Sequence, residues 1–376
     1  MPRRSRLKGA PLLIAAVSAR SLAAAANRAG LVPLTVDFFA DRDTQETAAA
    51  SLRFDGDMKT GIGERDLLDK LAVLAEAAPS PPIGFLYGSG FETNPGLLDA
   101  VAARWPVLGN GAETVSAVKD PGGFFRTLRS LGIPHPETRT TPPEHFEGWL
   151  VKRIGGAGGS HVSTAKDEAP GNVYYQRHVD GTPASLLFVA NGSEMTPIGF
   201  STQWAAPGPR SPWRYGGAVR PAALGDARET RMIGWIASLV EAFSLTGLGS
   251  ADFLVEDEKI WLLEINPRPG ATLDIFDDTA HPLISFHLDA VTTRKLPSRP
   301  STGGAAATAI VFARHGVTIP HGLEWPEWAS DRPKPGERIA KDGPICTVMA
   351  RGKTKDQARQ CAERRVREIW AAVSGT

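Results

Sequence analysis

The sequence predicts a mixed protein of the α/β and α+β classes. An N-terminal open parallel α/β unit is followed by a β-rich centre and a small C-terminal α+β unit. Two observations indicate this arrangement. Apolar runs alternate with helical patterns over the first 110 residues, which is typical of a parallel sheet. From "GWLVKRIGGAGGSHVST" onward, strand patterns follow one another and are separated by glycine, Asp-Gly and Asn-Gly turns.

The expected elements of the first unit are strands at 11–17 and 31–37, a helix at 20–29, a helix around 64–78, a strand within 83–92, a helix near 95–104 and a strand and turn at 105–110. Ligands of open α/β sheets bind beyond the carboxyl ends of the strands. Polar and glycine residues at those ends are therefore candidate pocket residues: Ser18, Arg20, Gly88, Ser89, Gly90 and Glu92.

Composition limits the classes of partner and the compartment. The chain has 376 residues, 42% hydrophobic residues and a net charge of +1, without an apolar run as long as a membrane span. We expect neither a nucleic-acid nor a membrane partner. Cys346 and Cys361 form no CxxC motif, which favours a reducing cytoplasm and excludes a disulfide framework. The start "MPRRSRLKGAPLLIAAVSAR" loosely imitates a signal peptide, but a strand–helix–strand unit explains more of it.

The remaining pattern predicts a helix over 119–131, three β segments within 173–203, a helix over 227–243, a hairpin over 250–266 and a helix near 281–291. Strands within 304–320 and 343–354 and a helix over 355–372 complete the chain. The Pro-rich stretch "KLPSRPSTGG" is the best candidate boundary. We expect domains at 1–112, 113–300 (subdivided into 113–180 and 181–300) and 301–376.

The stretch "WLLEINPRPGATLD" places Glu264, Asn266 and Arg268 on one face of a strand. A five-residue connection centred on Glu258 would set Asp252 directly opposite Glu264. Facing carboxylates repel each other unless a cation lies between them. Oxygen ligands from Asp, Glu and Asn suit Mg²⁺, which favours a metal site over a solvated polar face.

The stretch "VKRIGGAGGS" follows a strand that carries Lys152, and its glycines are Gly155, Gly156, Gly158 and Gly159. Glycine lets backbone N–H groups approach an anion, and lysine adds charge for a phosphate. It is not a Walker A loop, and taken alone a glycine-rich turn between strands is more often a flexible hairpin. The next stretch, "YYQRHVDG", alone indicates an edge strand before a turn.

Taken in order, these motifs resemble the ATP-grasp superfamily over nearly the whole chain. "YGSGFE", "GNGAE", "KDP", "YGGAVRP" and "EINPRPGATLD" are closest to the predicted ATP-dependent carboligases related to biotin carboxylase. The resemblance implies an ATP-grasp fold, with a pre-ATP-grasp domain ahead of domains that clamp a nucleotide. It implies nucleotide contacts from Lys119, Lys152, Gly155, Gly156, Gly158, Gly159, Gln176, Arg177 and Val179, and Mg²⁺ ligands Asp252, Glu264 and Asn266.

The same resemblance implies an ATP-dependent ligase that forms ADP. ATP and Mg²⁺, for which Mn²⁺ can substitute, would convert a small-molecule carboxylate into an acyl phosphate that an amine then attacks, a reaction suited to cofactor biosynthesis. Arg268 and Arg220 are the expected catalytic residues, and Arg214 is a further candidate. Thr272 stands where a biotin carboxylase has its glutamate base, and the chain has no biotinylation signature. A kinase, a carboxylase or an inactive ATP-binding regulator remain alternatives, and a homodimer is the one assembly considered.

Overall fold

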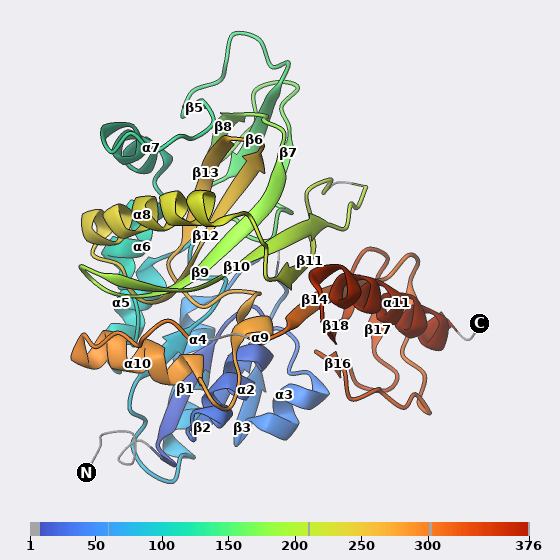
Figure 1. The fold of residues 1–376 in the computed structure, drawn as a ribbon. Helices are drawn as coiled ribbons and strands as arrows, with labels where there is room; N and C mark the ends of the chain where they lie inside the picture. The colour runs from blue at the N-terminus through green and yellow to red at the C-terminus, as the bar shows by residue number, and fades with distance from the viewer. Residues whose placement is uncertain (1–7, 59, 210, 301–302, 375–376) are drawn as a thin grey trace.

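The computed structural model describes residues 8–58, 60–209, 211–300 and 303–374. In this part of the chain the strands form a parallel four-stranded sheet, an antiparallel eight-stranded sheet, an antiparallel four-stranded sheet and a two-stranded ribbon. Figure 1 shows the parallel sheet below the long sheet and the smaller antiparallel sheet above it. None of the helices within these residues combines the length and apolar character that crossing a bilayer requires.

The N-terminal unit is an open parallel sheet with strand order β3-β2-β1-β4. Its elements are β1 (Pro11–Ala15), α2 (Arg20–Arg28), β2 (Val32–Asp37), α3 (Arg42–Thr47), β3 (Ala50–Arg53), α4 (Glu64–Glu76), β4 (Phe85–Tyr87) and α5 (Gly96–Ala102). The sequence pattern missed α3 and β3, because β3 is a short, half-exposed edge strand without an apolar run. The strand expected at 105–110 contributes only one bridge, between Phe85 and Val107. Residues 1–7 of the basic start lie outside the described residues.

The long sheet has the order β13-β12-β9-β10-β11-β14-β18-β16. Its central strand is buried on both faces by alternate residues. On one face, Leu186 and Phe188 of β9 belong to the same hydrophobic core as side chains of α8. On the other face, Leu187 and Val189 belong to the same core as side chains of α10. Figure 1 shows α8 and α10 on opposite sides of this sheet. The strands and helices are β9 (Thr182–Asn191), β10 (Met195–Ala205), β11 (Tyr215–Arg220), α8 (Asp226–Phe243), β12 (Thr246–Glu256), β13 (Lys259–Asn266), α9 (Leu273–Phe276) and α10 (Leu283–Thr293).

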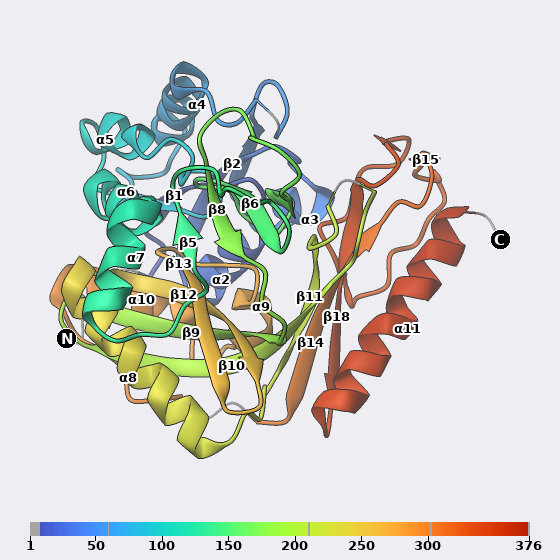
Figure 2. The same ribbon diagram turned by 90° about the horizontal axis from the view of Figure 1, so that it is seen from above.

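The C-terminal part continues this sheet, since β14 pairs with β11 and β18. Helix α11 packs along β14 and β18, as Figure 2 shows from above. The predicted boundary between residues 300 and 301 thus lies between two strands, β11 and β14, of one continuous sheet. The predicted domain limits remain a prediction. The elements are β14 (Ala305–Phe312), β15 (Val317–Thr318), β16 (Ala329–Ser330), β17 (Arg338–Ile339), β18 (Pro344–Gly352) and α11 (Lys355–Ser374).

The smaller antiparallel sheet has the order β5-β8-β6-β7 and follows two short helices. The helix expected over 119–131 forms over Pro121–Ser130, and a helix that was not expected, Ala112–Lys119, precedes it and ends directly before Asp120. Its carboxylate accepts hydrogen bonds from the N–H groups of Gly122 and Gly123, and Pro121 begins the second helix. This capping makes Asp120 a helix start instead of a mid-helix position. The elements are α6 (Ala112–Lys119), α7 (Pro121–Ser130), β5 (Thr138–Arg139), β6 (Trp149–Arg153), β7 (Val162–Thr164) and β8 (Val173–Arg177).

The β12–β13 hairpin sets Asp252 opposite Glu264, which confirms the predicted pairing. The connection itself is shorter than expected. Glu256 pairs with Lys259, so two residues form the turn instead of five. A register shift beyond Asp252 leaves Leu263 as an extra residue on β13. This bulge compensates for the shorter turn and restores the facing carboxylates.

Candidate functional site

The acidic pair lies on neighbouring strands at one edge of the long sheet. Asp252 Oδ2 accepts a hydrogen bond from Asn266 Nδ2 at 3.1 Å, and Asp252 Oδ1 accepts one from Gln203 Nε2 at 3.3 Å. Burial, reinforced by the charge of Glu264, raises the pKa of Asp252 to about 6. The two carboxylates therefore repel each other as the sequence analysis expected.

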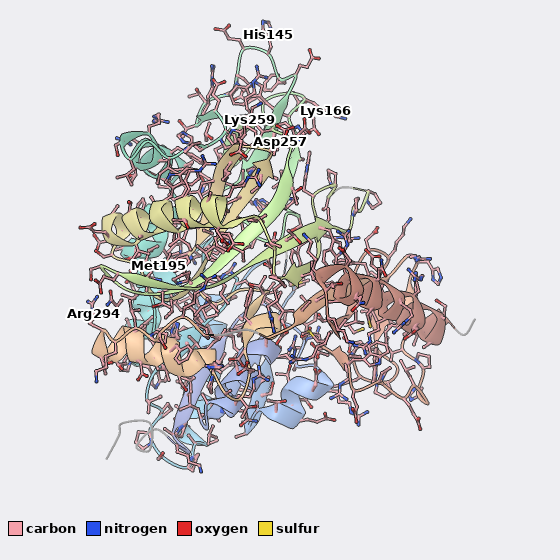
Figure 3. All side chains as sticks on the ribbon, viewed as in Figure 1. His145, Lys166, Met195, Asp257, Lys259 and Arg294 are labelled. Carbon is pink, nitrogen blue, oxygen red and sulfur yellow. The ribbon has the colours of Figure 1, made fainter. Side chains whose placement is uncertain are left out.

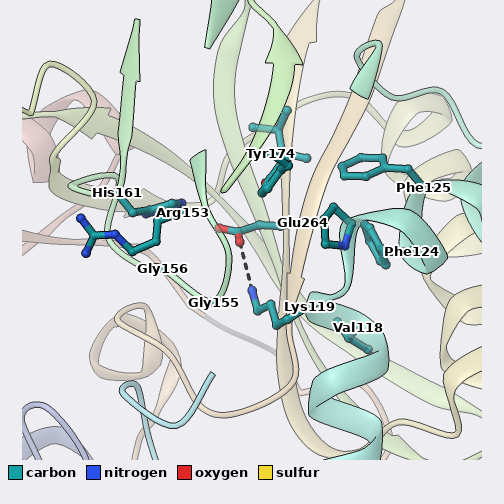
Figure 4. A pocket seen from close by; sticks show the side chains of 12 residues that line it. Val118, Lys119, Phe124, Phe125, Arg153, Gly155, Gly156, His161, Tyr174 and Glu264 are labelled. Carbon is teal, nitrogen blue, oxygen red and sulfur yellow. Dashed lines mark hydrogen bonds and ion pairs between the residues drawn. The ribbon is translucent and has the colours of Figure 1, made fainter. Parts of the chain in front are cut away.

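Lys119 at the end of α6 already bridges these side chains. Its Nζ lies 3.0 Å from Glu264 Oε2 and 3.0 Å from Asn266 Oδ1, and Figure 4 shows the ion pair with Glu264. Burial alone would raise the pKa of Glu264, but the charges of Lys119, His161 and Lys152 outweigh it and hold that pKa at about 2. Glu264 is thus ionised, and its oxygens together with that of Asn266 accept a cation.

The donor set fits Mg²⁺ in kind. Within the described ranges, no three His, Cys, Asp or Glu side chains lie close enough to hold a metal ion. The predicted set has only two carboxylates and takes its third oxygen from the Asn266 amide. Such hard oxygen donors suit Mg²⁺, which fills its remaining positions with water and substrate phosphates. The assignment of these three residues as metal ligands remains a prediction.

Lys152 and Gln176, two of the predicted nucleotide contacts, lie on β6 and β8 of the smaller sheet. Lys152 Nζ donates to Gln176 Oε1 at 2.6 Å, and Gln176 Nε2 donates to Thr138 Oγ1 at 3.1 Å. Burial lowers the pKa of Lys152 to about 8, although Glu264 and Asp252 oppose that shift. The structure thus brings the buried Lys152 and Gln176 together.

Arg177 and Val179 are two further predicted nucleotide contacts. The exposed guanidinium of Arg177 lies over the Trp149 ring, 5.0 Å from its centroid, and donates to the carbonyl of Glu147 at 2.7 Å. Val179 follows β8 and is half-buried. The side chain of Arg177 is therefore engaged on the outside of the sheet, which leaves backbone groups as its means of contacting a base.

The glycine loop between β6 and β7 is held on both sides. Gly155 has φ +72°, and a Cβ there would lie 2.3 Å from the carbonyl oxygen of Glu92. Gly159 has φ +71°, and a Cβ there would lie 1.9 Å from the carbonyl oxygen of Trp213. The N–H of Tyr215 also donates to the carbonyl of Gly158 at 2.9 Å. The loop requires glycine because other backbone lies against it.

A pocket lies where these parts meet, between the two antiparallel sheets. Lys119, Glu264 and the glycine loop line one part of it, and Phe124, Phe125 and Tyr174 line another. Figure 4 shows these side chains converging on one space. His161 also lines the pocket, although sequence reasoning did not single it out. The available signal was a histidine inside the quoted motif "GGAGGSHV".

Arg268 is bound to the N-terminal unit. Its Nε donates to Glu92 Oε1 at 2.6 Å, and the N–H of Gly90 donates to Glu92 Oε2 at 2.9 Å. The neighbouring carbonyl of Pro267 accepts a hydrogen bond from Asn110 Nδ2 at 2.8 Å. The segment that follows β13 is therefore anchored on the N-terminal unit. Asn110 lies in the quoted "GNGAE" motif but had no predicted role.

The two upstream arginines are held by backbone carbonyls. Arg220 Nη1 donates to Gly304 O at 3.1 Å, and Arg220 Nε donates to Ile275 O. Arg214 Nη1 donates to Asp342 O at 2.8 Å, so it reaches toward the C-terminal part. Neither residue lines the pocket. A catalytic role for Arg220 remains a prediction.

The candidates at the carboxyl ends of β1 and β4 serve local or interdomain contacts. Arg20 makes two hydrogen bonds to Asp274, at 2.9 and 2.6 Å, and pairs with Asp331 at 3.1 Å. Ser18 Oγ donates to Asp331 at 3.2 Å. The carbonyl of Ser89 accepts from the N–H of Val17, and a Cβ on Gly88 would lie 2.8 Å from Ala16.

Residues 119–272, which span the two lysines, the glycine loop and the acidic hairpin, match the family described as the ATP-grasp domain. The chain contains an ATP-grasp domain. The fold of almost the whole chain resembles that of a solved structure. It superimposes on the structure of a biotin carboxylase–β-γ-ATP complex from Campylobacter jejuni with a TM-score of 0.72, at 15% identity, covering 95% of this chain and 90% of that one. At this identity the match shows a shared fold.

Two further proteins are similar to this chain in sequence. A protein of Methanocaldococcus jannaschii named "Uncharacterized protein MJ0776" is 24% identical over 277 residues, which cover 68% of each chain. The carbamoyl phosphate synthase large chain of Rubrobacter xylanophilus is 25% identical over 246 residues. That match covers 57% of this chain and only 23% of the synthase. The ATP-grasp chain therefore corresponds to a part of that enzyme.

Proposed function

We propose that the protein is an ATP- and Mg²⁺-dependent ligase that joins a small-molecule carboxylate to an amine through an acyl phosphate. The carrying observation is that Lys119, the glycine loop and Glu264 line one pocket between two sheets, with Lys152 close enough to influence Glu264. The match of the same residues to the ATP-grasp domain and the names of the relatives support ATP-driven ligation.

Each group in the pocket has a role that its position supports. Lys119, Lys152 and the glycine-loop N–H groups bind the phosphates of ATP. Asp252, Glu264 and Asn266 would hold Mg²⁺, which neutralises phosphate charge when bound. Lys119 then turns from Glu264 toward a phosphate. Arg268, held by Glu92, neutralises the substrate carboxylate or the transferred phosphoryl group.

The proposed reaction has two displacements. A carboxylate oxygen of the acid attacks the terminal phosphorus of ATP, and the bond from that phosphorus to ADP breaks. The amine nitrogen then attacks the carbonyl carbon of the acyl phosphate, the bond to the phosphate oxygen breaks, and the amine loses a proton as inorganic phosphate leaves. Such a reaction needs positioning and charge neutralisation more than a covalent nucleophile. The closed glycine loop excludes water that would hydrolyse the acyl phosphate.

A screen for ADP release tests this function. Purified protein with ATP and Mg²⁺ is incubated with pairs of carboxylic acids and amines, amino acids included. The Asp252→Asn/Glu264→Gln variant is the control. We expect ADP release that requires both an acid and an amine and is lost in the control. Release with a stable phosphate ester would indicate a kinase, and dependence on bicarbonate a carboxylase. ATP binding without turnover for any pair would indicate a regulator.

The proposal also covers the cellular location and the oligomeric state of the protein. Both cysteines are free thiols, as a reducing cytoplasm requires. We expect small-molecule partners only, a cytoplasmic location and a homodimer, and size-exclusion chromatography with light scattering tests the last of these.

A further inference from the structure

We propose that His161 binds the terminal phosphate of ATP and so makes the site prefer ATP to ADP. This inference rests on the proposed function, because it requires that the pocket binds a nucleotide. It assigns a specificity-determining role to a side chain of the glycine loop, in addition to the loop's backbone.

The loop holds the His161 side chain in the pocket. His161 stands directly before β7, and its carbonyl accepts a hydrogen bond from the N–H of Arg153 at 3.2 Å, which closes the base of the loop. A Cβ on Gly156 would lie 2.3 Å from Cβ and 2.4 Å from Cγ of His161. The loop thus folds directly over the ring. In Figure 4 the ring of His161 points toward the carboxylate of Glu264 across the pocket.

One ring nitrogen lacks a partner. Nδ1 of His161 is buried and has no hydrogen-bond partner among the residues that the structure describes. Buried polar atoms are nearly always paired in folded proteins, so an unpaired one that lines a pocket indicates a ligand. The nearest charged groups are those of the nucleotide site. Burial lowers the pKa of His161. Glu264 and a hydrogen bond to the backbone of Ala157 oppose this shift, while Lys152 and, more weakly, Lys119 reinforce it.

The position opposite Glu264 indicates which part of the ligand His161 meets. Mg²⁺ held by Glu264 and Asn266 would take its further ligands from the phosphates distal to the base. In this proposal the base lies toward Gln176, a predicted nucleotide contact that accepts a hydrogen bond from Lys152. A phosphate oxygen near Glu264 is therefore the terminal one. It accepts a hydrogen bond from a ring N–H of His161, supplying the partner that Nδ1 lacks.

Separate titrations with ATP and ADP in Mg²⁺ test the inference. Isothermal titration calorimetry gives Kd for the wild type, His161→Phe and His161→Asn, with His145→Asn as the matched control on an exposed outer loop (Figure 3). We expect His161→Phe to weaken ATP binding by about tenfold or more while ADP binding changes by less than about threefold. His161→Asn, whose amide can still donate, should retain most of the preference, and the control should match the wild type.

Several outcomes separate the inference from the function. Equal losses for ATP and ADP in both variants would mean that His161 only packs, and unchanged Kd values would also overturn the inference. In either case the proposed function stands if the wild type binds MgATP. A wild type that binds neither nucleotide would remove both. Melting temperatures identify a variant that fails to fold, and His161→Asn then decides.

Discussion

The Nε of Arg268 donates to Oε1 of Glu92 at 2.6 Å, and these side chains are only 7% and 1% exposed. The pair joins the segment after β13 to the N-terminal parallel sheet. Burial tends to raise the pKa of Glu92, but the charges of Arg268 and Lys119 outweigh it and hold that pKa below its usual range. Glu92, a candidate pocket residue from sequence, thus orients Arg268.

Removing one partner of this pair should be costly. Glu92→Gln leaves a buried guanidinium without its counter-charge, and we expect the free energy of unfolding to fall by about 3 kcal/mol. Glu92→Met/Arg268→Met removes both charges and should recover most of that loss. Glu363→Gln, from the exposed pair Arg359–Glu363, is the control and should change stability by less than about 1 kcal/mol. Urea denaturation measures all three, and equal effects for Glu92→Gln and Glu363→Gln would refute a structural role for the pair.

Lys152 should act on binding more than on stability. Its ammonium is buried, and its pKa is lowered to about 8 by that burial. Lys152→Met removes a desolvated charge but leaves Gln176 Oε1 without its donor, so the melting temperature should change little, while ATP binding should weaken by about tenfold or more. Lys166→Met, at an exposed lysine after β7, is the matched control. Fluorescence titration with ATP measures the difference, and equal Kd values for the two variants would contradict the assignment of Lys152.

Two glycines of the same loop, Gly155 and Gly158, allow a matched test of its role in ATP binding. Gly155→Ala would place a Cβ 2.3 Å from the carbonyl oxygen of Glu92, so the loop must move away from Glu92. Gly158 has a similar φ of +67°, but no described heavy atom lies within 4 Å of a Cβ there. Gly158→Ala therefore costs backbone strain of about 1–2 kcal/mol without a clash. We expect Gly155→Ala to weaken ATP binding clearly more than Gly158→Ala. The reverse order would show that the contact of the loop with Glu92 does not contribute to ATP binding.

Stability should depend on pH through His287. Its Nδ1 accepts the N–H of Leu248 at 2.8 Å, and its other ring nitrogen lies 2.8 Å from the carbonyl of Leu108. Burial lowers its pKa to about 4, although the Leu108 carbonyl opposes this. The unfolded state, with a pKa near 6.5, then binds the proton more readily. This contribution is complete above about pH 6.5 and is lost as pH falls toward 4.

The size of this effect can be checked by comparing variants. Relative to neutral pH, protonation of His287 should cost the wild type about 2 kcal/mol at pH 5. His287→Leu should lack this component, whatever its absolute stability. Urea denaturation of both proteins at pH 7.5 and pH 5 gives the difference, with the exposed His315→Leu as a control. Parallel pH profiles for wild type and His287→Leu would exclude His287 as the source.

Contacts between residues that are close in sequence could be predicted from the sequence. The pairing of Asp252 with Glu264 was predictable because alternation and a local turn determine it, and even the misjudged turn length was compensated by a bulge. The parallel sheet followed from repeated strand and helix patterns. The short helix α6 was missed, and Asp120 separates it from the predicted helix by capping α7 with a single side chain.

Contacts between distant segments were beyond sequence reasoning. Arg268 and Glu92 lie 176 positions apart, and nothing local to either residue indicates the other. Arg220 was expected to be catalytic, and its sequence gives no sign that carbonyls of α9 and of the segment before β14 bind its guanidinium. The empty hydrogen-bonding site on His161 likewise depends on how the loop folds over its ring.

Calorimetric titration of ATP in the presence and absence of Mg²⁺ tests the central claim most directly, because it requires no knowledge of the acid or the amine. The account predicts saturable binding at one site per chain, strengthened by Mg²⁺, and weakened by about thirtyfold or more in Asp252→Asn/Glu264→Gln, whose fold is checked by its melting temperature. Binding that is indifferent to Mg²⁺ and to the double substitution, or the absence of any binding to the folded wild type, would contradict it.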